Sequence, residues 1–258
     1  MQVPVRQSVR SGDMGECGND EFDIRELGTI LGVWAHPDDE AYLSAGLMAM
    51  AVDVGSRVVC VTATRGELGS MDLERWPVAT LADVRTRELA VSLELLGVSE
   101  HVWLDYPDGG CADVPADEAV DRLVTLIDDV EPDTFFTFGP DGMTGHDDHR
   151  TVSEWTSAAF ARTAKPGARL FHATKTDTFD DRFATTSGHR RAFGDAGSPR
   201  TPEHETAIAC RLTDAFVDVK VAALRAQVSQ VDVLRAEMGH DLYREWVAHE
   251  WFCLAATR

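Results

Sequence analysis

Two short apolar runs, each followed by a helical pattern, constrain the fold of this chain most strongly. Residues 28–35 are rich in β-formers with little polar alternation, which indicates a strand buried on both faces. The apolar stretch 40–54 follows and ends before Gly55, which predicts a buried helix. Strands buried on both faces belong to parallel sheets covered by helices. We therefore expect an α/β fold, a Rossmann-like three-layer sandwich with a mainly parallel sheet.

The same arrangement recurs farther along the chain. Residues 134–138 predict a strand, residues 139–145 a loop and residues 152–162 a helix. If the two strands share one parallel sheet, the turns at 35–40 and 145–149 lie together at its carboxyl edge. Open α/β folds bind their ligands at this edge.

Both turns contain histidine and carboxylate side chains at spacings that suit a metal ion. The first turn, AHPDDE, places His36 and Asp39 three residues apart, so that one ion can contact both. The second turn, GHDDH, places His146 and His149 on one face near the start of a helix. A catalytic zinc takes three protein ligands of these types and keeps one position open for water. The two turns together predict the site of a zinc hydrolase.

With these residues the sequence resembles the PIG-L/LmbE-like zinc-dependent deacetylases, which act on N-acetylglucosaminyl substrates. The first family signature, AHPDDE, is complete at 35–40. The second is usually a GHPDH-like run, and here Asp147 replaces its proline. That proline is not a ligand in the family, so the departure concerns the stiffness of the turn. The resemblance covers most of residues 28–256 and implies an LmbE-like fold.

The resemblance also implies a role for each polar side chain of the two turns. Zinc would be held by His36, Asp39 and His149. Asp38 would be the general base, a role that suits a carboxylate beside water whose pKa zinc has lowered to about 7. His146 would stabilise the oxyanion or protonate the leaving amine, and Asp148 would orient an imidazole.

Two weaker matches suggest residues that bind the substrate. Arg85 occupies the place of an arginine that lines the sugar pocket in relatives, and Asp108 lies in a Pro-Asp-Gly turn that often carries a substrate-facing aspartate. Two ordinary readings remain open, a surface ion pair of Arg85 with Glu88 and a plain turn residue at Asp108. Residues 65–67 follow the strand expected at 58–63 and are weaker candidates for the pocket.

A late helix is expected to be part of the scaffold. Apolar residues recur at helical spacing between Val217 and Met238, which predicts one helix with a face on the core. Gln227 stands within it where relatives often have histidine. Glutamine cannot supply a titrating proton, so any catalytic role of that histidine is absent here.

The charge and cysteine content of the chain indicate which binding partners and which cellular compartment to expect. The formal net charge of −20 argues against a nucleic-acid or anionic-membrane surface, because phosphate binding needs a local excess of Lys and Arg. The five cysteines form no C-x-x-C pair, which favours reduced thiols in a cytoplasm over a disulfide framework. We find no signal-peptide pattern and no apolar run that could span a membrane.

The polar segments suggest a simple domain organisation. Residues 1–26 resemble a flexible tail, and residues 27–258 are expected to form a single LmbE-like domain. Within it, residues 175–205 are rich in Thr, Gly, Asp and Arg and predict a long loop or lid.

Together, these features predict a metal-dependent N-deacetylase that releases acetate from an N-acetylglucosamine-type sugar conjugate. Zn²⁺ suits the expected ligands, and Fe²⁺, Co²⁺ and Mn²⁺ are also compatible with them. One alternative is an amidase for a related thiol-sugar conjugate or a longer N-acyl group. Another is a non-catalytic Rossmann-like binding module, which the acidic first turn disfavours because it lacks G-x-G-x-x-G. A homo-oligomer is compatible with either.

Overall fold

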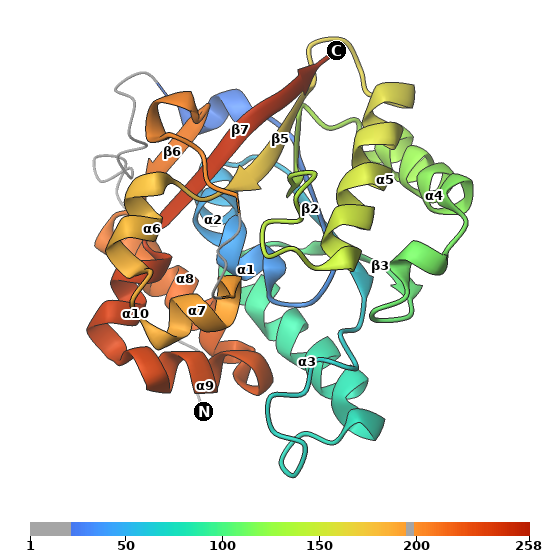
Figure 1. The fold of residues 1–258 in the computed structure, drawn as a ribbon. Helices are drawn as coiled ribbons and strands as arrows, with labels where there is room; N and C mark the ends of the chain where they lie inside the picture. Colours follow the sequence, from blue (N-terminus) through green and yellow to red (C-terminus); the bar gives the residue numbers. More distant parts are fainter. Residues whose placement is uncertain (1–21, 195–198) are drawn as a thin grey trace.

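A seven-stranded sheet forms the centre of the molecule (Figure 1), which a computed structural model describes over residues 22–194 and 199–258. The strand order is β3-β2-β1-β4-β5-β7-β6, and all pairs are parallel except those of β7 with β5 and β6. The strands are β1 (Ile30–Trp34), β2 (Val58–Thr64), β3 (Glu100–Tyr106), β4 (Thr134–Phe138), β5 (Arg169–Thr174), β6 (Ile208–Arg211) and β7 (His249–Thr257). The expected mainly parallel α/β fold is confirmed.

Helices cover both faces of this sheet. Helices α4 and α5 pack together on one side, and α2, α3 and α8 on the other (Figure 1). The α-helices are α1 (Asp39–Leu43), α2 (Ala45–Asp53), α3 (Val78–Leu96), α4 (Ala116–Val130), α5 (Asp147–Thr163), α6 (Asp177–Phe183), α7 (Ser187–Phe193), α8 (Asp214–Ala226), α9 (Val228–Met238) and α10 (His240–Val247). Three short 3₁₀ helices are η1 (Ile24–Leu27), η2 (Cys111–Asp113) and η3 (Glu203–Glu205).

The strand order places the two acidic turns side by side. Strand β1 pairs directly with β4, and the chain continues from β1 to β2 but reaches β4 from β3, so the direction of winding reverses between β1 and β4. All residues of both strands are buried, as expected for inner strands of a covered parallel sheet. The turns after β1 and β4 therefore meet at the switch point, where open α/β sheets form their ligand crevice.

The helix expected at 40–54 is instead two helices, α1 and α2, that are interrupted at Ser44. The side chain of Glu250 supplies the physical reason. It accepts hydrogen bonds from the backbone N–H groups of Gly46 (2.7 Å) and Leu47 (2.9 Å) and so caps the start of α2. Lys220 neutralises this fully buried carboxylate at 2.7 Å.

The late helix also differs from the sequence prediction, because it divides into α8 and α9 at Gln227. Gln227 has φ −94° and ψ 54°, outside the helical region, and its side chain is buried. Its amide Nε2 donates to Glu40 Oε1 at 2.7 Å and to Ser92 Oγ at 3.2 Å. Apolar spacing alone could not reveal this break, since the periodic face continues across it.

The segment 175–205, which the sequence predicts to be a long loop or lid, is partly helical in the described residues. It contains α6 and α7, and each helix begins with a threonine side chain that accepts a backbone N–H: Thr176 from Phe179 and Thr186 from His189. Phe179 and Phe183 are buried, so these short helices pack against the domain. In the expected tail, residues 1–21 lie outside the described residues, whereas residues 24–26 belong to η1, with Ile24 buried.

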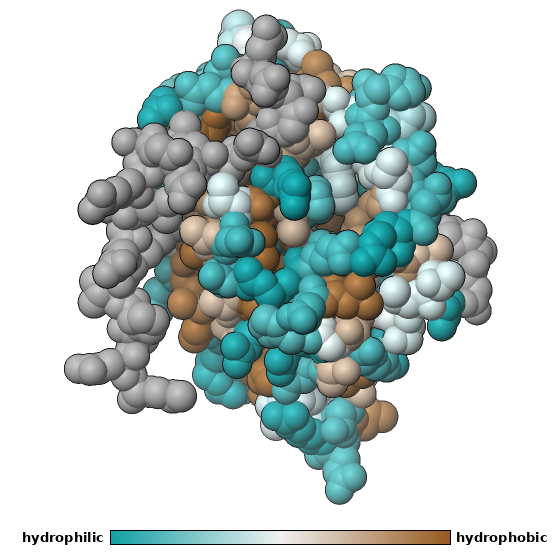
Figure 2. All heavy atoms as spheres, turned by 90° about the vertical axis from the view of Figure 1, so that its left-hand side faces the viewer, coloured by the Kyte–Doolittle hydropathy of each residue, from teal (hydrophilic) through white to brown (hydrophobic). Residues whose placement is uncertain are grey.

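The surface fits the acidic, polar composition. On the face turned toward the viewer in Figure 2, hydrophilic residues predominate and hydrophobic residues show between them. Over the described residues, every helix is too short or too polar to cross a bilayer.

Candidate active site

Three side chains converge at the carboxyl edge of β1 and β4. His36 Nδ1 lies 3.1 Å from His149 Nε2, and the Asp39 carboxylate lies 3.5 Å from the first nitrogen and 3.4 Å from the second. Asp39 is three residues beyond His36 at the start of α1, and His149 lies in the first turn of α5. All three side chains are buried.

In each imidazole, one nitrogen faces Asp39 and the other, the far nitrogen, points away from it. The hydrogen bond of the far nitrogen determines which tautomer the ring adopts. His149 Nδ1 lies 2.9 Å from the carbonyl oxygen of Gly142, and His36 Nε2 lies 3.1 Å from both Asp108 Oδ1 and Asp148 Oδ2. These oxygens can only accept, so the far nitrogens carry the protons. When both rings are neutral, the nitrogens that face Asp39 therefore present lone pairs.

The three side chains could hold one metal ion. Around a tetrahedral zinc with bonds of 2.0–2.1 Å, ligand atoms are about 3.3 Å apart. The two nitrogens are 3.1 Å apart, Asp39 Oδ2 lies 3.5 Å from His36 Nδ1, and the other carboxylate oxygen, Oδ1, lies 3.4 Å from His149 Nε2, so the spacing of the three side chains is close to this value. Two nitrogen lone pairs at 3.1 Å would repel each other without a shared cation. Imidazoles oriented by carboxylates or carbonyls are typical of metal ligands.

The electrostatics of Asp39 and His149 are consistent with this chemistry, whereas His36 holds its proton more tightly than a free imidazole. Burial would raise the pKa of Asp39, but His149 and His36 lower it to about 2. Burial lowers the pKa of His149, which favours the neutral imidazole that a metal binds. For His36, burial lowers the pKa, yet its hydrogen bonds to carboxylates raise it well above the usual value.

Asp108 and Asp148 lie behind His36. Asp148 also accepts backbone N–H groups from Gly109 (2.7 Å) and Cys111 (3.0 Å), which fixes its carboxylate. Asp108 accepts the N–H of Leu68 at 2.8 Å. Asp108, which the sequence suggests as a substrate contact, thus holds an imidazole in this structure, in the same way as Asp148.

Asp38 occupies a strained backbone position at the start of α1. Its φ of 99° is uncommon for any residue but glycine and costs about 1–3 kcal/mol. The side chain of Glu40 accepts the Asp38 N–H at 3.0 Å, and the Asp38 carbonyl accepts the N–H of Ala41 at 3.0 Å and of Tyr42 at 2.9 Å. Held in this way, the Asp38 side chain is 18% exposed, more than Asp39 beside it at 10%.

Arg85 is buried and contacts Asp38. Its burial excludes the exposed surface ion pair with Glu88 that the sequence left open. Its guanidinium donates to the carbonyl oxygens of Gly66 (2.8 Å) and Pro37, and Nη2 lies 3.4 Å from Asp38 Oδ2. Glu88, the other member of the expected surface pair, instead accepts the N–H and hydroxyl of Ser229. Burial raises the pKa of Asp38 to about 7, and Arg85 opposes this rise.

His146 lies at the exposed side of the cluster. Its ring is 4.8 Å from the ring of His36 and 5.1 Å from that of His149, measured between centroids. Nδ1 accepts the N–H of Asp148 at 3.2 Å, so the proton of the neutral ring is on Nε2, which can donate to a developing negative charge. Asp147 pairs with Arg150 at the surface.

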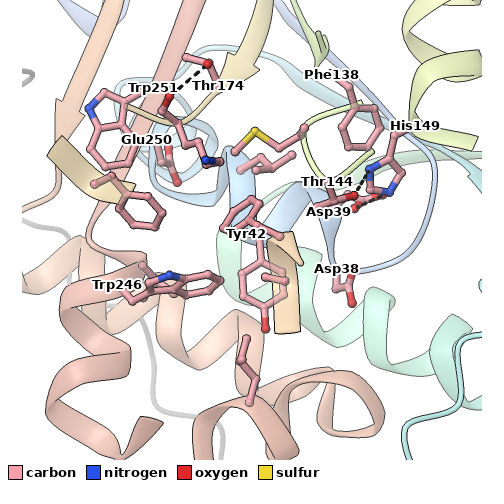
Figure 3. Close-up of a pocket in the computed structure, with 18 of the residues that line it drawn as sticks. Asp38, Asp39, Tyr42, Phe138, Thr144, His149, Thr174, Trp246, Glu250 and Trp251 are labelled. Carbon is pink, nitrogen blue, oxygen red and sulfur yellow. Dashed lines mark hydrogen bonds and ion pairs between the residues drawn. The ribbon is translucent and has the colours of Figure 1, made fainter. Parts of the chain in front are cut away.

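Sequence reasoning missed two parts of the site. Glu40 and Gln227 support Asp38 from within the core, although nothing in the residue pattern connects positions so far apart in the chain. The second part is a cavity of about 250 Å³ that adjoins Asp38, Asp39 and His149. In Figure 3 these three residues lie at one end of it and Trp246 and Trp251 at the other, with Tyr42 between them.

The weaker candidates at 65–67 lie at the rim. Arg65 pairs with Asp105 at 2.8 Å and stacks over the ring of Trp103 at 4.3 Å. Glu67 accepts the N–H of Asp108 at 3.0 Å, and so supports the loop behind His36.

Comparison with known proteins identifies the family. Residues 31–160 match the family model PIG-L, GlcNAc-PI de-N-acetylase. The chain belongs to the PIG-L family. A 1D-myo-inositol 2-acetamido-2-deoxy-alpha-D-glucopyranoside deacetylase from Saccharomonospora viridis is 33% identical over 236 residues, covering 79% of this chain and 85% of the relative. The deacetylase of the same name from Kineococcus radiotolerans is 35% identical over 168 residues, 54% of this chain and about half (46%) of that relative's length.

Solved structures show the same fold within and beyond the PIG-L deacetylases. N,N'-diacetylchitobiose deacetylase from Pyrococcus horikoshii has a TM-score of 0.61 at 20% identity, covering 91% of this chain and 87% of the other. The 4-carboxy-2-hydroxymuconate hydratase GalB from Pseudomonas putida KT2440 also has a TM-score of 0.61, at 16% identity, covering 90% and 98%. The second enzyme catalyses a hydration, so the reaction must be argued from the site.

Proposed function

We propose that this PIG-L family protein is a metal-dependent hydrolase that removes the N-acetyl group from an N-acetylglucosamine-type sugar conjugate. One observation carries the proposal: two imidazole nitrogens with free lone pairs and one carboxylate converge within 3.1–3.5 Å beside the strained, partly exposed Asp38. The names of relatives, deacetylases of an inositol-linked acetamido sugar, support the same substrate class.

The residues that would hold the metal are His36, Asp39 and His149. A divalent ion there would polarise the amide carbonyl and make water a better nucleophile at neutral pH. Two imidazoles and a carboxylate suit Zn²⁺ and also Fe²⁺, Co²⁺ or Mn²⁺. Asp108 and Asp148 keep the first imidazole in the orientation and tautomer that metal binding needs.

The remaining residues divide the proton transfers between them. Asp38 accepts a proton from the water that attacks the acetamido carbonyl carbon, and its contact with Arg85 keeps the carboxylate directed at the site. His146, with its proton on Nε2, donates a hydrogen bond to the oxyanion that forms. The C–N bond then breaks as Asp38 passes the proton it took from water to the leaving amine, and acetate is released. In this scheme Arg85 and Asp108 act on Asp38 and His36 and not directly on the sugar.

The location and assembly of the protein remain predictions. The cysteine pattern favours a cytoplasmic enzyme with reduced thiols, and the acidic composition favours a small-molecule substrate over nucleic acid or an anionic membrane. A homo-oligomer is compatible with these features.

Acetate release from a panel of N-acetylglucosamine conjugates tests the proposed reaction. The protein is assayed as purified, after chelation, and after each divalent metal is restored. We expect release that disappears on chelation and returns with metal. If a stoichiometric metal binds but no conjugate is cleaved, the deacetylase proposal is wrong and a binding module or a hydratase-like reaction becomes the better account of the site.

A further inference from the structure

The cavity beside the candidate active site extends well past the reacting groups. It begins at Asp38, Asp39 and His149 and has a volume of about 250 Å³. This is the space of roughly eight water-sized groups, far more than the methyl group of an acetamide needs. Six aromatic side chains contribute to its wall: Tyr42, Phe138, Phe179, Phe193, Trp246 and Trp251.

All of these aromatic side chains except Phe138 pack against one another. The ring of Phe179 lies 5.2 Å from that of Trp251 and 6.1 Å from that of Trp246, and Trp246 lies 5.7 Å from Tyr42. They come from α1, α6, α10 and β7, so the wall exists only after the C-terminal part of the chain packs against the first acidic turn. Figure 3 shows Tyr42 projecting between the catalytic end and the tryptophans.

Several polar side chains in this wall already have partners, whereas the buried Nε1 of Trp246 has none. Both oxygens of Glu250 accept backbone N–H groups, and one also accepts Lys220 Nζ. Three further pairs in or beside the wall are Lys175 with Asp180, Thr174 with Thr201 and Arg191 with Glu237. A sugar placed here would leave hydroxyl groups without partners, and each such group costs about 1–3 kcal/mol. An apolar chain requires no partner.

Two aromatic residues of the wall lie next to the metal-site residues His149 and Asp39. Phe138 stacks on His149 with centroids 4.1 Å apart, and Tyr42 follows Asp39 on α1. A sugar ring would separate any aglycone from the scissile amide, whereas the acyl carbons are bonded to its carbonyl. The group that enters this cavity first is therefore the acyl group.

We propose that the cavity binds the acyl chain of the substrate, and that this enzyme hydrolyses N-acyl amino-sugar conjugates with chains longer than acetyl. The proposal rests on the proposed amidohydrolase function and specifies its substrate class. Water adds its oxygen to the acyl carbon, the C–N bond breaks, and the products are a fatty acid and the free amine of the sugar. Tyr42 and the two tryptophans act as specificity residues.

A chain-length series tests this inference. Glucosamine conjugates with N-acetyl to N-decanoyl groups are incubated with the metal-loaded enzyme, and the free amine is measured. We expect kcat/KM for the octanoyl compound to exceed that for acetyl at least tenfold, since each buried methylene can contribute about fourfold. Failure of all compounds, acetyl included, would reject the proposed function. Preference for acetyl would leave that function intact and overturn the acyl pocket.

A second series of substrates tests whether the cavity binds the aglycone and not the acyl group. N-acetylglucosamine conjugates with methyl, octyl and phenyl aglycones are compared. We expect less than a threefold spread in kcat/KM. If the octyl or phenyl aglycone gives the larger acceleration, the cavity takes the aglycone and the acyl proposal is wrong.

Ala192 offers a way to fill the cavity without changing a catalytic group. It lies in the wall on α7, and Ala192→Trp is expected to lower the octanoyl-to-acetyl ratio of kcat/KM at least tenfold. Ala161→Trp, on the exposed surface of α5, is the matched control and should keep the wild-type ratio. An unchanged ratio in a folded Ala192→Trp protein would contradict the proposal.

A binding measurement is independent of turnover. Octanoate, but not acetate, should change the fluorescence of the tryptophans in the wall, both with metal and after chelation. This change should be lost in Ala192→Trp and kept in Ala161→Trp. Equal responses to octanoate in both variants would overturn the assignment.

Discussion

The amide nitrogen of Gln227 donates to Glu40 Oε1 at 2.7 Å, and both side chains are buried. The other oxygen of Glu40 accepts the backbone N–H of Asp38, so the break between α8 and α9 is linked through one carboxyl group to the strained first acidic turn. Burial raises the pKa of Glu40 to about 8. The orientation of its carboxyl group is fixed by the two hydrogen bonds that it accepts. Gln227 is thus a positioning residue for Asp38.

Gln227→Leu should lower kcat about 10–100-fold while KM changes little, because a slight displacement of Asp38 misaligns the general base. Gln227→His should retain most activity because it can still donate to Glu40. Steady-state kinetics on the metal-loaded proteins measure both. If Gln227→Leu is fully active with wild-type metal content, this link does not support catalysis.

Arg85→Met should lower kcat about 10–100-fold by releasing Asp38 from its cationic neighbour. Arg85→Lys should recover only part of this activity, since lysine lacks the planar fork that reaches the carbonyls of Gly66 and Pro37. The division between kcat and KM is the informative measurement. A rise in KM at constant kcat would instead support the sugar-contact role that the sequence suggests.

Asp38→Asn and His36→Ala should distinguish the role of a general base from that of a metal ligand. Asp38→Asn is expected to lose about 100-fold to 10,000-fold in kcat but to keep its metal, because general-base catalysis contributes that much. His36→Ala should lose both metal and activity. Metal analysis after dialysis distinguishes them, and equal loss of metal from the two variants would refute this division of roles.

Lys220→Met should destabilise the protein by about 3–5 kcal/mol, because it leaves the fully buried carboxylate of Glu250 without its cation. Denaturant unfolding measures this change. The double variant Lys220→Met/Glu250→Gln should regain part of the loss, since the amide oxygen can still accept an N–H of α2. A loss below about 1 kcal/mol in the single variant would show that this pair is not needed for stability.

His101 should make the stability of the fold sensitive to acid. Burial lowers its pKa to about 4, below the usual 6.5, so the folded state prefers the neutral ring. The free energy of unfolding is not reduced by this histidine above pH 6.5. It falls between pH 6.5 and about 4, because in this range the unfolded chain binds a proton on His101 and the folded chain does not. In His101→Asn the free energy of unfolding should decline less over this range. Parallel slopes for the two proteins would contradict the assignment.

How far the sequence predicted the site depends on the range of each interaction. Residues 35–40 and 145–149 identified the cluster of His36, Asp39 and His149 because its geometry follows from two strand-to-helix turns on adjacent strands. The roles expected for Arg85 and Asp108 could not be worked out in the same way. Their partners, Asp38 and His36, are distant in the chain, and side-chain burial decided what each one contacts.

The parallel α/β architecture and the convergence of the two acidic turns follow from the sequence alone, since hydrophobic runs and local turn chemistry act over a few residues. The positions at which long helical patterns break depend on how the folded chain packs, because the causes are single buried hydrogen-bonding groups, Glu250 at Gly46 and Glu40 at Gln227. The shape of the aromatic cavity depends on the same packing. That cavity is lined by residues of α1, β4, α6, α7, α9, α10 and β7, among others, and no local pattern in the chain encodes it.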